Sequence, residues 1–181
     1  MSNYKKPRSF SDYIRFYYLE NYLFDSVSKN FHKRGYLTPQ EFFCIVIWKA
    51  NRKKTQIRDA IRKRGISIEE LTAKINRTKI AEKKMSLLTE IKHIGIPMAS
   101  AILTVLYPKD FTVLDYRVWD DLKDKFVVEG RQPDTIKEYL EYVDVCKMFS
   151  KKYNKSLRDI DRFSWGRSFY RDLIKFLENK K

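Results

Sequence analysis

Apolar residues recur at helical spacing along almost the whole chain. Between Tyr13 and Phe31, aromatic and aliphatic side chains return every three or four positions, and Gly35 follows as a residue that commonly ends a helix. Thr38-Pro39-Gln40-Glu41 then has the form of a capping box with proline at the first helical position. The pattern therefore predicts one helix before Gly35 and another after it.

Start and stop signals divide the remaining chain into further helices. Two apolar segments, 80–92 and 97–107, precede Pro108, which ends the second one. Further helix starts are predicted at Ser67, Pro133 and Ser156, and a helix containing Val118, Leu122 and Phe126 is expected after Asp115. We therefore expect an all-α fold, a bundle of about eight or nine helices that forms one domain over 1–181 or two lobes sharing a core.

Composition agrees with this fold class and suggests a partner. Five glycines and five prolines among 181 residues are too few for the turns of a β-sandwich or barrel. Lysine and arginine outnumber aspartate and glutamate by 38 to 23, which gives a formal net charge of +15. A surface of this sign favours a polyanion, so we expect a nucleic-acid partner.

The cysteines and histidines exclude several kinds of metal site. Cys44 and Cys146 lie far apart in apolar helical segments, as expected for small buried side chains in a reducing compartment. They cannot form a four-cysteine metal or iron–sulfur site, and His32 and His93 are too few for a histidine-based one. No apolar run approaches the length of a membrane span, so we expect a soluble, cytoplasmic monomer without a bound metal.

The segment 80–107 predicts a helix–hairpin–helix. Gly95 is expected to give the turn its conformational freedom, and Ala99 is small enough for the two helices to pack closely. Backbone amides at the start of the second helix form a natural anion site. The residues expected to contact a phosphate here are Lys92, His93, Ile94, Gly95, Ile96 and Met98. A plain helical hairpin buried in a bundle is the alternative.

Asp115 is the acidic residue that follows this hairpin, within an extended loop and helix spanning 111–126. One interpretation makes it an N-cap that accepts a hydrogen bond from the amide of Arg117 or Val118. The other makes it the catalytic carboxylate of a candidate enzyme. Both roles are compatible, because a carboxylate at a helix N-terminus stays ionised.

Together these segments resemble the helix–hairpin–helix DNA glycosylases of the endonuclease III and 8-oxoguanine glycosylase superfamily. The positions that carry the resemblance are Ile91, His93, Ile94, Gly95, Ala99 and the run Leu114-Asp115-Tyr116-Arg117-Val118. Trp48-Lys49-Ala50-Asn51-Arg52 adds a similarity to small bacterial members. The resemblance implies a nucleoid-associated enzyme of DNA repair that binds duplex DNA, extrudes a damaged or modified base and hydrolyses its N-glycosidic bond with Asp115.

Two departures from the superfamily pattern change what the resemblance implies. His93 replaces the first glycine of the hairpin, and Pro97 stands where bifunctional members carry the lysine that forms a Schiff base. The implied enzyme is monofunctional, uses water and has no lyase activity. It needs no cofactor, although hairpin carbonyls in relatives bind a monovalent cation. A non-catalytic DNA-binding module on the same scaffold, or an unrelated helical interaction protein, remains an alternative.

Basic and aromatic residues supply candidates for the rest of the interface. Phosphate contacts are expected from Lys49, Arg52, Lys53, Lys54 and Arg117. A base extruded from the duplex is stacked against aromatic or apolar side chains. The candidates for this pocket are Trp48, Tyr116, Trp119 and Trp165.

Overall fold

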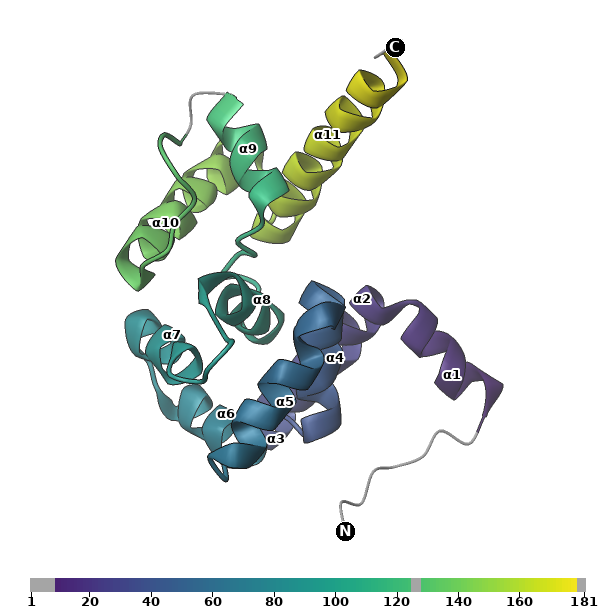
Figure 1. Ribbon diagram of the computed structural model, residues 1–181, viewed down its shortest axis with the longest axis vertical. Helices are drawn as coiled ribbons and strands as arrows, with labels where there is room; N and C mark the ends of the chain where they lie inside the picture. Colours follow the sequence, from purple (N-terminus) through teal and green to yellow (C-terminus); the bar gives the residue numbers. More distant parts are fainter. Residues whose placement is uncertain (1–8, 125–127, 179–181) are drawn as a thin grey trace.

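The computed structural model describes residues 9–124 and 128–178, and within these ranges the chain is helical without any β-strand (Figure 1). If the run Phe10–Arg34 is counted as one interrupted helix, the described residues form nine helices. The prediction of an all-α fold is therefore confirmed. Phe126 and the end of the predicted segment 111–126 lie outside the described residues.

The N-terminal run is not one regular helix but a series of short ones. In order, these are α1 (Phe10–Tyr17), α2 (Leu19–Asn21), the π-helical turn η1 (Tyr22–Val27) and α3 (Ser28–Arg34). Gly35 ends α3 with a φ of 88°, and its amide donates to the carbonyl oxygen of Phe31. The predicted stop at this glycine is confirmed, because a left-handed residue closes the last helical turn.

Side-chain caps set the next helix starts where the sequence places them. Thr38 Oγ1 accepts a hydrogen bond from the Glu41 amide at 3.3 Å, and Glu41 Oε2 accepts one from the Thr38 amide at 2.9 Å. This capping box opens α4, and Ser67 caps α6 by accepting from the Glu70 amide. The helices of this region are α4 (Pro39–Ala50), the 3₁₀ turn η2 (Asn51–Lys53), α5 (Lys54–Lys63) and α6 (Ile68–Arg77).

Helix α8 (Ile96–Leu106) is the centre of the core. It packs against α7 (Ala81–Thr89) and α4, and every one of its residues except Pro97 is buried. Burying each large aliphatic side chain contributes roughly 1.5–3 kcal/mol, so α8 is a main source of stability. Figure 1 shows it between the N-terminal helices and a C-terminal group.

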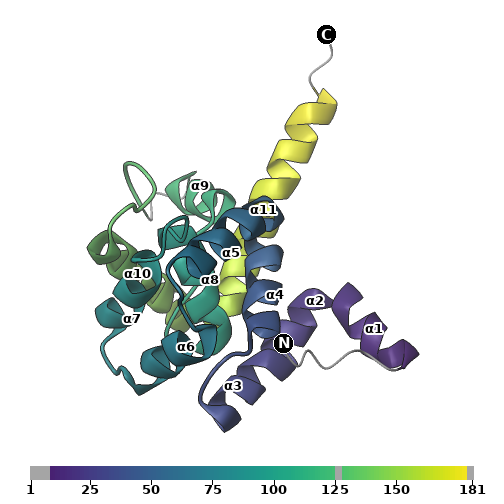
Figure 2. The ribbon, with the colours of Figure 1, turned by 60° about the horizontal axis from the view of Figure 1, so that its bottom comes forward.

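The C-terminal group consists of α9 (Tyr116–Asp124), α10 (Ile136–Tyr153) and α11 (Leu157–Glu178). The sequence predicts that Pro133 opens α10, but it does not. Thr135 does, through a capping box with Glu138, because a threonine side chain accepts a helix amide and proline cannot supply that contact. α9 packs along α11, and the C-terminal half of α11 projects from the body of the protein (Figures 1 and 2).

None of the helices formed by residues 9–124 and 128–178 combines the length and hydropathy that a bilayer-spanning helix needs.

Candidate functional site

The turn between α7 and α8 has its unusual backbone conformation at His93 and not at Gly95. His93 has a φ of 73°, whereas Gly95 is extended, with φ −85° and ψ −179°. Gly95 is the N-cap of α8, a position that takes extended backbone in any residue. The expectation that Gly95 supplies the turn's conformational freedom is therefore wrong, and the strained residue is a histidine, at about 1–2 kcal/mol.

Only part of the predicted amide cradle is free to bind an anion. The Ile94 amide donates to the Ile91 carbonyl and the Met98 amide to the Gly95 carbonyl, both at 3.0 Å. The side chains of Ile94, Ile96 and Met98 are buried in the core. Within the described part of the chain, the amides of Gly95 and Ile96 make no hydrogen bond. Because Ile96 is buried, the hairpin groups that can reach a phosphate are the Gly95 amide and the exposed Lys92 and His93.

The extended loop after α8 holds Asp115 in a defined position. The Leu114 amide donates to Ser100 Oγ at 2.9 Å, and the Tyr139 hydroxyl donates to the Thr112 carbonyl at 2.8 Å. Asp115 Oδ1 then accepts from the Arg117 amide at 3.1 Å. The predicted N-cap of α9 is confirmed, and it engages one of the two carboxylate oxygens.

The second oxygen of Asp115 binds a lysine from a distant helix. Lys49, near the end of α4, donates from Nζ to Asp115 Oδ2 at 2.8 Å and to the Leu114 carbonyl at 3.0 Å. The side chains are 12% and 24% exposed respectively, so the pair is largely but not fully buried. The structure thus places the Lys49 ammonium inside the protein, beside the candidate catalytic carboxylate, where the sequence suggested a surface contact with phosphate.

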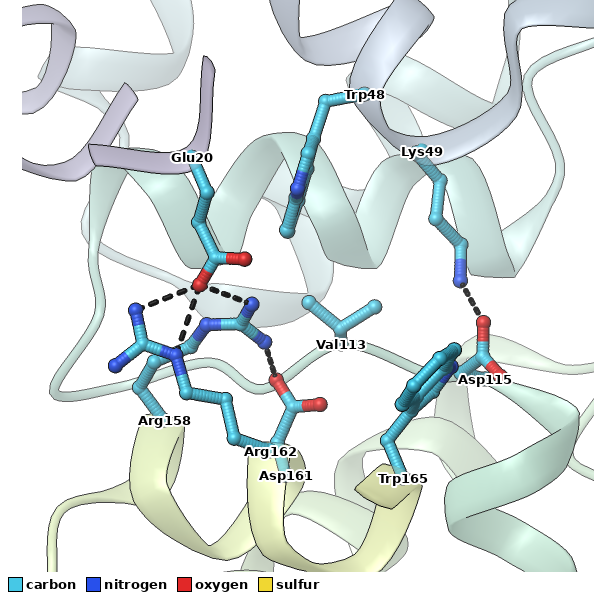
Figure 3. A pocket seen from close by; sticks show the side chains of 9 residues that line it. All are labelled: Glu20, Trp48, Lys49, Val113, Asp115, Arg158, Asp161, Arg162 and Trp165. Atoms are coloured by element: carbon cyan, nitrogen blue, oxygen red, sulfur yellow. Dashed lines mark hydrogen bonds and ion pairs between the residues drawn. The ribbon is translucent and has the colours of Figure 1, made fainter. Parts of the chain in front are cut away.

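This pair borders a cavity of about 550 Å³ between the N-terminal helices and α11 (Figure 3). Trp48 points into it from α4 and Trp165 from α11, so two of the four aromatic candidates line the same cavity. The lining residues are Glu20, Trp48, Lys49, Val113, Asp115, Arg158, Asp161, Arg162 and Trp165. We call this space the cavity.

A charged network that the sequence analysis missed lines one side of the cavity. Glu20 Oε1 accepts from Arg158 Nη2 at 2.7 Å and from Arg162 Nε at 2.8 Å, and Arg158 also binds Asp161 (Figure 3). The Arg158 guanidinium lies 5.2 Å from the centre of the Trp48 ring. These residues come from α2 and α11, and no local motif connects them in the sequence.

Burial and charge shift the two acids of this network in opposite directions. Burial raises the pKa of Asp161 to about 6, although Arg158 acts to lower it. Burial also acts to raise the pKa of Glu20, but hydrogen bonds and charge from Arg158 and Arg162 outweigh it, so this pKa is lowered. Asp161 therefore takes up a proton at a higher pH than Glu20 does.

A second space, the hairpin hollow, adjoins the cavity and measures about 750 Å³. Lys49 and Asp115 line both spaces and so stand at their boundary. The hollow brings the hairpin and the basic turn η2 together. It is lined by Lys49, Ala50, Asn51, Arg52, Lys53, His93, Gly95, Pro97, Met98, Leu114, Asp115, Tyr116 and Gln132.

Two predicted site residues have other partners. Trp119 is 8% exposed and packs with its ring 6.0 Å from that of Tyr142, in the core and not in the cavity. Arg117 pairs with Asp172, and its guanidinium lies 5.6 Å from the ring centres of both Trp165 and Phe169. Its charge is already neutralised by a carboxylate.

No group of three or more histidine, cysteine, aspartate or glutamate side chains within the described ranges is arranged to hold a metal ion. The two cysteines are free thiols, and burial raises the pKa of Cys44 to about 11 and that of Cys146 to about 12. The charged side chains that line the cavity are those of Asp115, Lys49 and the charged network. No protein-family model, curated protein or solved structure matches this chain.

Proposed function

We propose that this protein is a DNA glycosylase of the helix–hairpin–helix class, which binds duplex DNA and hydrolyses the N-glycosidic bond of a damaged or modified base. The observation that carries the proposal is the position of Asp115. Its carboxylate stands between a hollow lined by the hairpin and basic residues and a cavity lined by two tryptophans. A buried cap without access to either space would have favoured a purely structural role.

The two spaces divide the parts of a nucleotide between them. The free amide of Gly95, with Arg52 and Lys53, suits a phosphate in the hairpin hollow. The cavity lies within the range of roughly 300–1,000 Å³ that is usual for small-molecule sites, and its tryptophans offer stacking surfaces for an extruded base. The deoxyribose then lies at the boundary, next to Asp115.

This position suits the carboxylate for hydrolysis of the glycosidic bond. As the base departs, positive charge develops on the sugar, and an ionised carboxylate next to it lowers the barrier. Oδ1 accepts from the Arg117 amide and Oδ2 accepts from Lys49 Nζ, so a water molecule oriented by this carboxylate would donate to a remaining lone pair. Pro97 lines the hairpin hollow and offers no amine, so base release in this proposal uses water.

One observation favours a second candidate, a DNA-binding module without catalysis. Asp115 Oδ2 is already bound to Lys49, and Glu20 and Asp161 are bound to arginines, so the charges of the cavity satisfy one another. An arrangement of this kind is also what a purely structural network between helices looks like. The two candidates differ in whether a base is released.

The test is incubation with a panel of end-labelled duplexes, each with one damaged or modified base, followed by hot alkali to reveal abasic sites. We expect cleavage at one lesion or a small group of lesions. Binding to all duplexes with release from none would contradict the glycosylase and favour the binding module. Absence of binding to any duplex would contradict both.

A further inference from the structure

The C-terminal half of α11 turns its polar side toward the protein and an apolar side outward. Arg167 and Arg171 pair with Asp121 and Asp124 of α9. The large apolar side chains on the opposite side of the helix are 40–77% exposed. A surface helix normally buries its apolar side, so this arrangement indicates a surface that meets a partner. We call it the α11 face, and it consists of Gly166, Phe169, Tyr170, Leu173, Phe176 and Leu177.

Gly166 and Leu173 lie on the centre line of the α11 face. They are seven residues apart, which is close to two helical turns, and the aromatic and leucine side chains of the face flank them on both sides. A Cβ added at Gly166 would meet nothing within 4 Å. The centre line therefore has an open space at Gly166 and a protruding side chain at Leu173.

We propose that the α11 face binds the same face of a second copy of this chain, with the two α11 helices antiparallel. In a twofold dimer every contact occurs twice, so Leu173 of each copy fits into the open space at Gly166 of the other. Three residues further along each helix, Phe176 of one copy then lies opposite Phe163 of the other. This inference goes beyond the proposed function, does not depend on it, and replaces the expectation of a monomer.

A groove at Phe163 supports this register. It measures about 550 Å³, and its lining includes Leu122 of α9, Phe149 of α10 and Ile160 of α11. Phe176, at 77%, is the most exposed side chain of the α11 face and stands on the projecting end of the helix (Figures 1 and 2). In the proposed dimer, the projecting end of each copy therefore covers the groove of the other.

The area of the surface is close to what a stable dimer needs. A fully exposed aromatic side chain presents roughly 150–250 Å², so the exposed fractions of the α11 face and Phe163 amount to on the order of 700 Å². Stable interfaces bury about 800 Å² on each partner. The face is thus large enough to hold two copies together with little contribution from the rest of the surface.

The charges of α11 favour a second copy over an anionic membrane. All four arginines of α11 pair with a carboxylate, so two copies can approach each other here despite the net charge of +15. Lys175 is seven residues from the buried Ser168 and so lies on the polar side of the helix. A helix that binds an anionic bilayer needs unpaired cations beside its apolar side, and the α11 face has none among its arginines.

The first test measures the mass of the full chain by sedimentation velocity over a range of concentrations. We expect a dimer that dissociates on dilution. Gly166→Leu adds a side chain into space that is open in a single copy, so the fold should be retained. In the dimer this side chain competes with Leu173 of the other copy, and the dissociation constant should rise about tenfold or more.

Two further variants control for this effect. Adding Leu173→Ala to Gly166→Leu exchanges the large and the small side chain of the contact, so dimerisation should be restored. Lys83→Leu places the same apolar side chain at an exposed position of α7 and should leave the dimer unchanged.

Cysteine crosslinking tests the register of the two helices. Tyr170→Cys places a thiol next to the twofold axis, so a short bis-maleimide should join the two copies. Phe176→Cys places its two thiols about 20 Å apart along the helices, at 1.5 Å per residue, so they should not be joined. The parent protein, which has the free thiols of Cys44 and Cys146, is the control.

The remaining outcomes would overturn the proposal. A chain that stays monomeric at every concentration would do so, and binding of this monomer to vesicles of anionic lipid would assign the α11 face to a membrane surface. A dimer that Gly166→Leu does not weaken, or crosslinking as strong at position 176 as at 170, would overturn the antiparallel pairing. None of these results bears on base release, so the proposed function is tested separately.

Discussion

Positive charges in two neighbouring regions of this protein differ in what holds them. The surface cations are Arg52, Lys53 and Lys54; the cavity cations are Lys49, Arg158 and Arg162. Lys53 and Lys54 donate to the neutral amides of Gln56 and Asn51, and none of the surface cations pairs with a carboxylate within the described chain. Every cavity cation pairs with one.

This difference separates two uses of the same residue types. A cation without a carboxylate partner is available to phosphates and gives binding that weakens as salt rises. A cation paired inside a cavity fixes the position of its partner, and its charge is not available at long range. The net charge of +15 therefore overstates the charge available to an anionic partner and says nothing about the geometry at Asp115.

The change expected to have the largest effect removes the anionic partner of Lys49. On a base that the protein releases, Asp115→Asn should slow release by about 100-fold or more, the scale seen when a partner of the transition-state charge is lost. The asparagine oxygen still accepts from the Arg117 amide, so the cap and the fold should be retained. DNA binding should persist or tighten, because a negative charge disappears.

Single-turnover base release measures this effect, with Asp120→Asn on the exposed side of α9 as the control of equal charge. If Asp115→Asn released the base at the parental rate, Asp115 would have only the structural role of an N-cap.

Within the cavity, Asp161→Asn tests whether burial of Asp161, which pairs with Arg158, makes the stability of the protein depend on pH. The pKa of Asp161 rises from 3.8 to about 6, so the folded chain keeps a proton that the unfolded chain releases between these pH values. This stabilisation is full below the unfolded pKa and is lost as pH rises through about 6. From about pH 4 to pH 7, the variant should therefore gain roughly 2–3 kcal/mol in unfolding free energy relative to the parent.

Chemical denaturation across this pH range gives the measurement. A constant difference between the two proteins would show that Asp161 titrates as an ordinary carboxylate.

The surface cations are tested by salt. Replacing Arg52, Lys53 and Lys54 together with alanine should lower duplex affinity and reduce the slope of log affinity against log salt by about 2 to 3, close to 0.9 per lost phosphate contact. Arg117→Ala, at a residue already paired with Asp172, should leave the slope almost unchanged. Equal slope changes in the two proteins would remove the distinction between free and paired cations.

The smallest effect concerns the hairpin between the two regions. His93→Gly should stabilise the protein by roughly 0.5–1 kcal/mol, because His93 has a φ of 73° that glycine adopts freely. Gly95→Ala should change stability little, since an added Cβ would lie 3.9 Å from Pro97 Cδ, an ordinary contact. Thermal unfolding of both variants checks this. If Gly95→Ala lowered the stability strongly and His93→Gly did not raise it, the strained backbone position of the turn would be Gly95.

Local signals in the sequence were sufficient for most of the fold. The caps at Thr38, Ser67 and Ser156, and the stop at Gly35, depend on contacts within a few residues and were found correctly. The predicted start at Pro133 is wrong, because the capping box that opens α10, Thr135 with Glu138, lies two residues further on.

The site depended on contacts that no local pattern encodes. Lys49 and Asp115 are 66 positions apart, and Glu20 meets Arg158 across 138 positions. Trp119 and Trp165 carry equal aromatic character in the sequence, yet the first faces Tyr142 in the core and the second faces the cavity. Motif spacing located Asp115, but only the packing of α4 and α11 around it showed what it touches.

The π-helical turn η1 has a consequence for how the cavity could arise in evolution. A π turn accommodates one extra residue inside a continuous helix, and each residue turns the helix by about 100°. Glu20 lies before this turn, whereas the buried Val27 and Phe31 lie at or after it. Loss of a single codon within Tyr22–Val27 would rotate Glu20 away from Arg158 while leaving α3 in the core. Among descendants of this gene, such one-residue length changes are where we expect cavity chemistry to diverge while the fold stays the same.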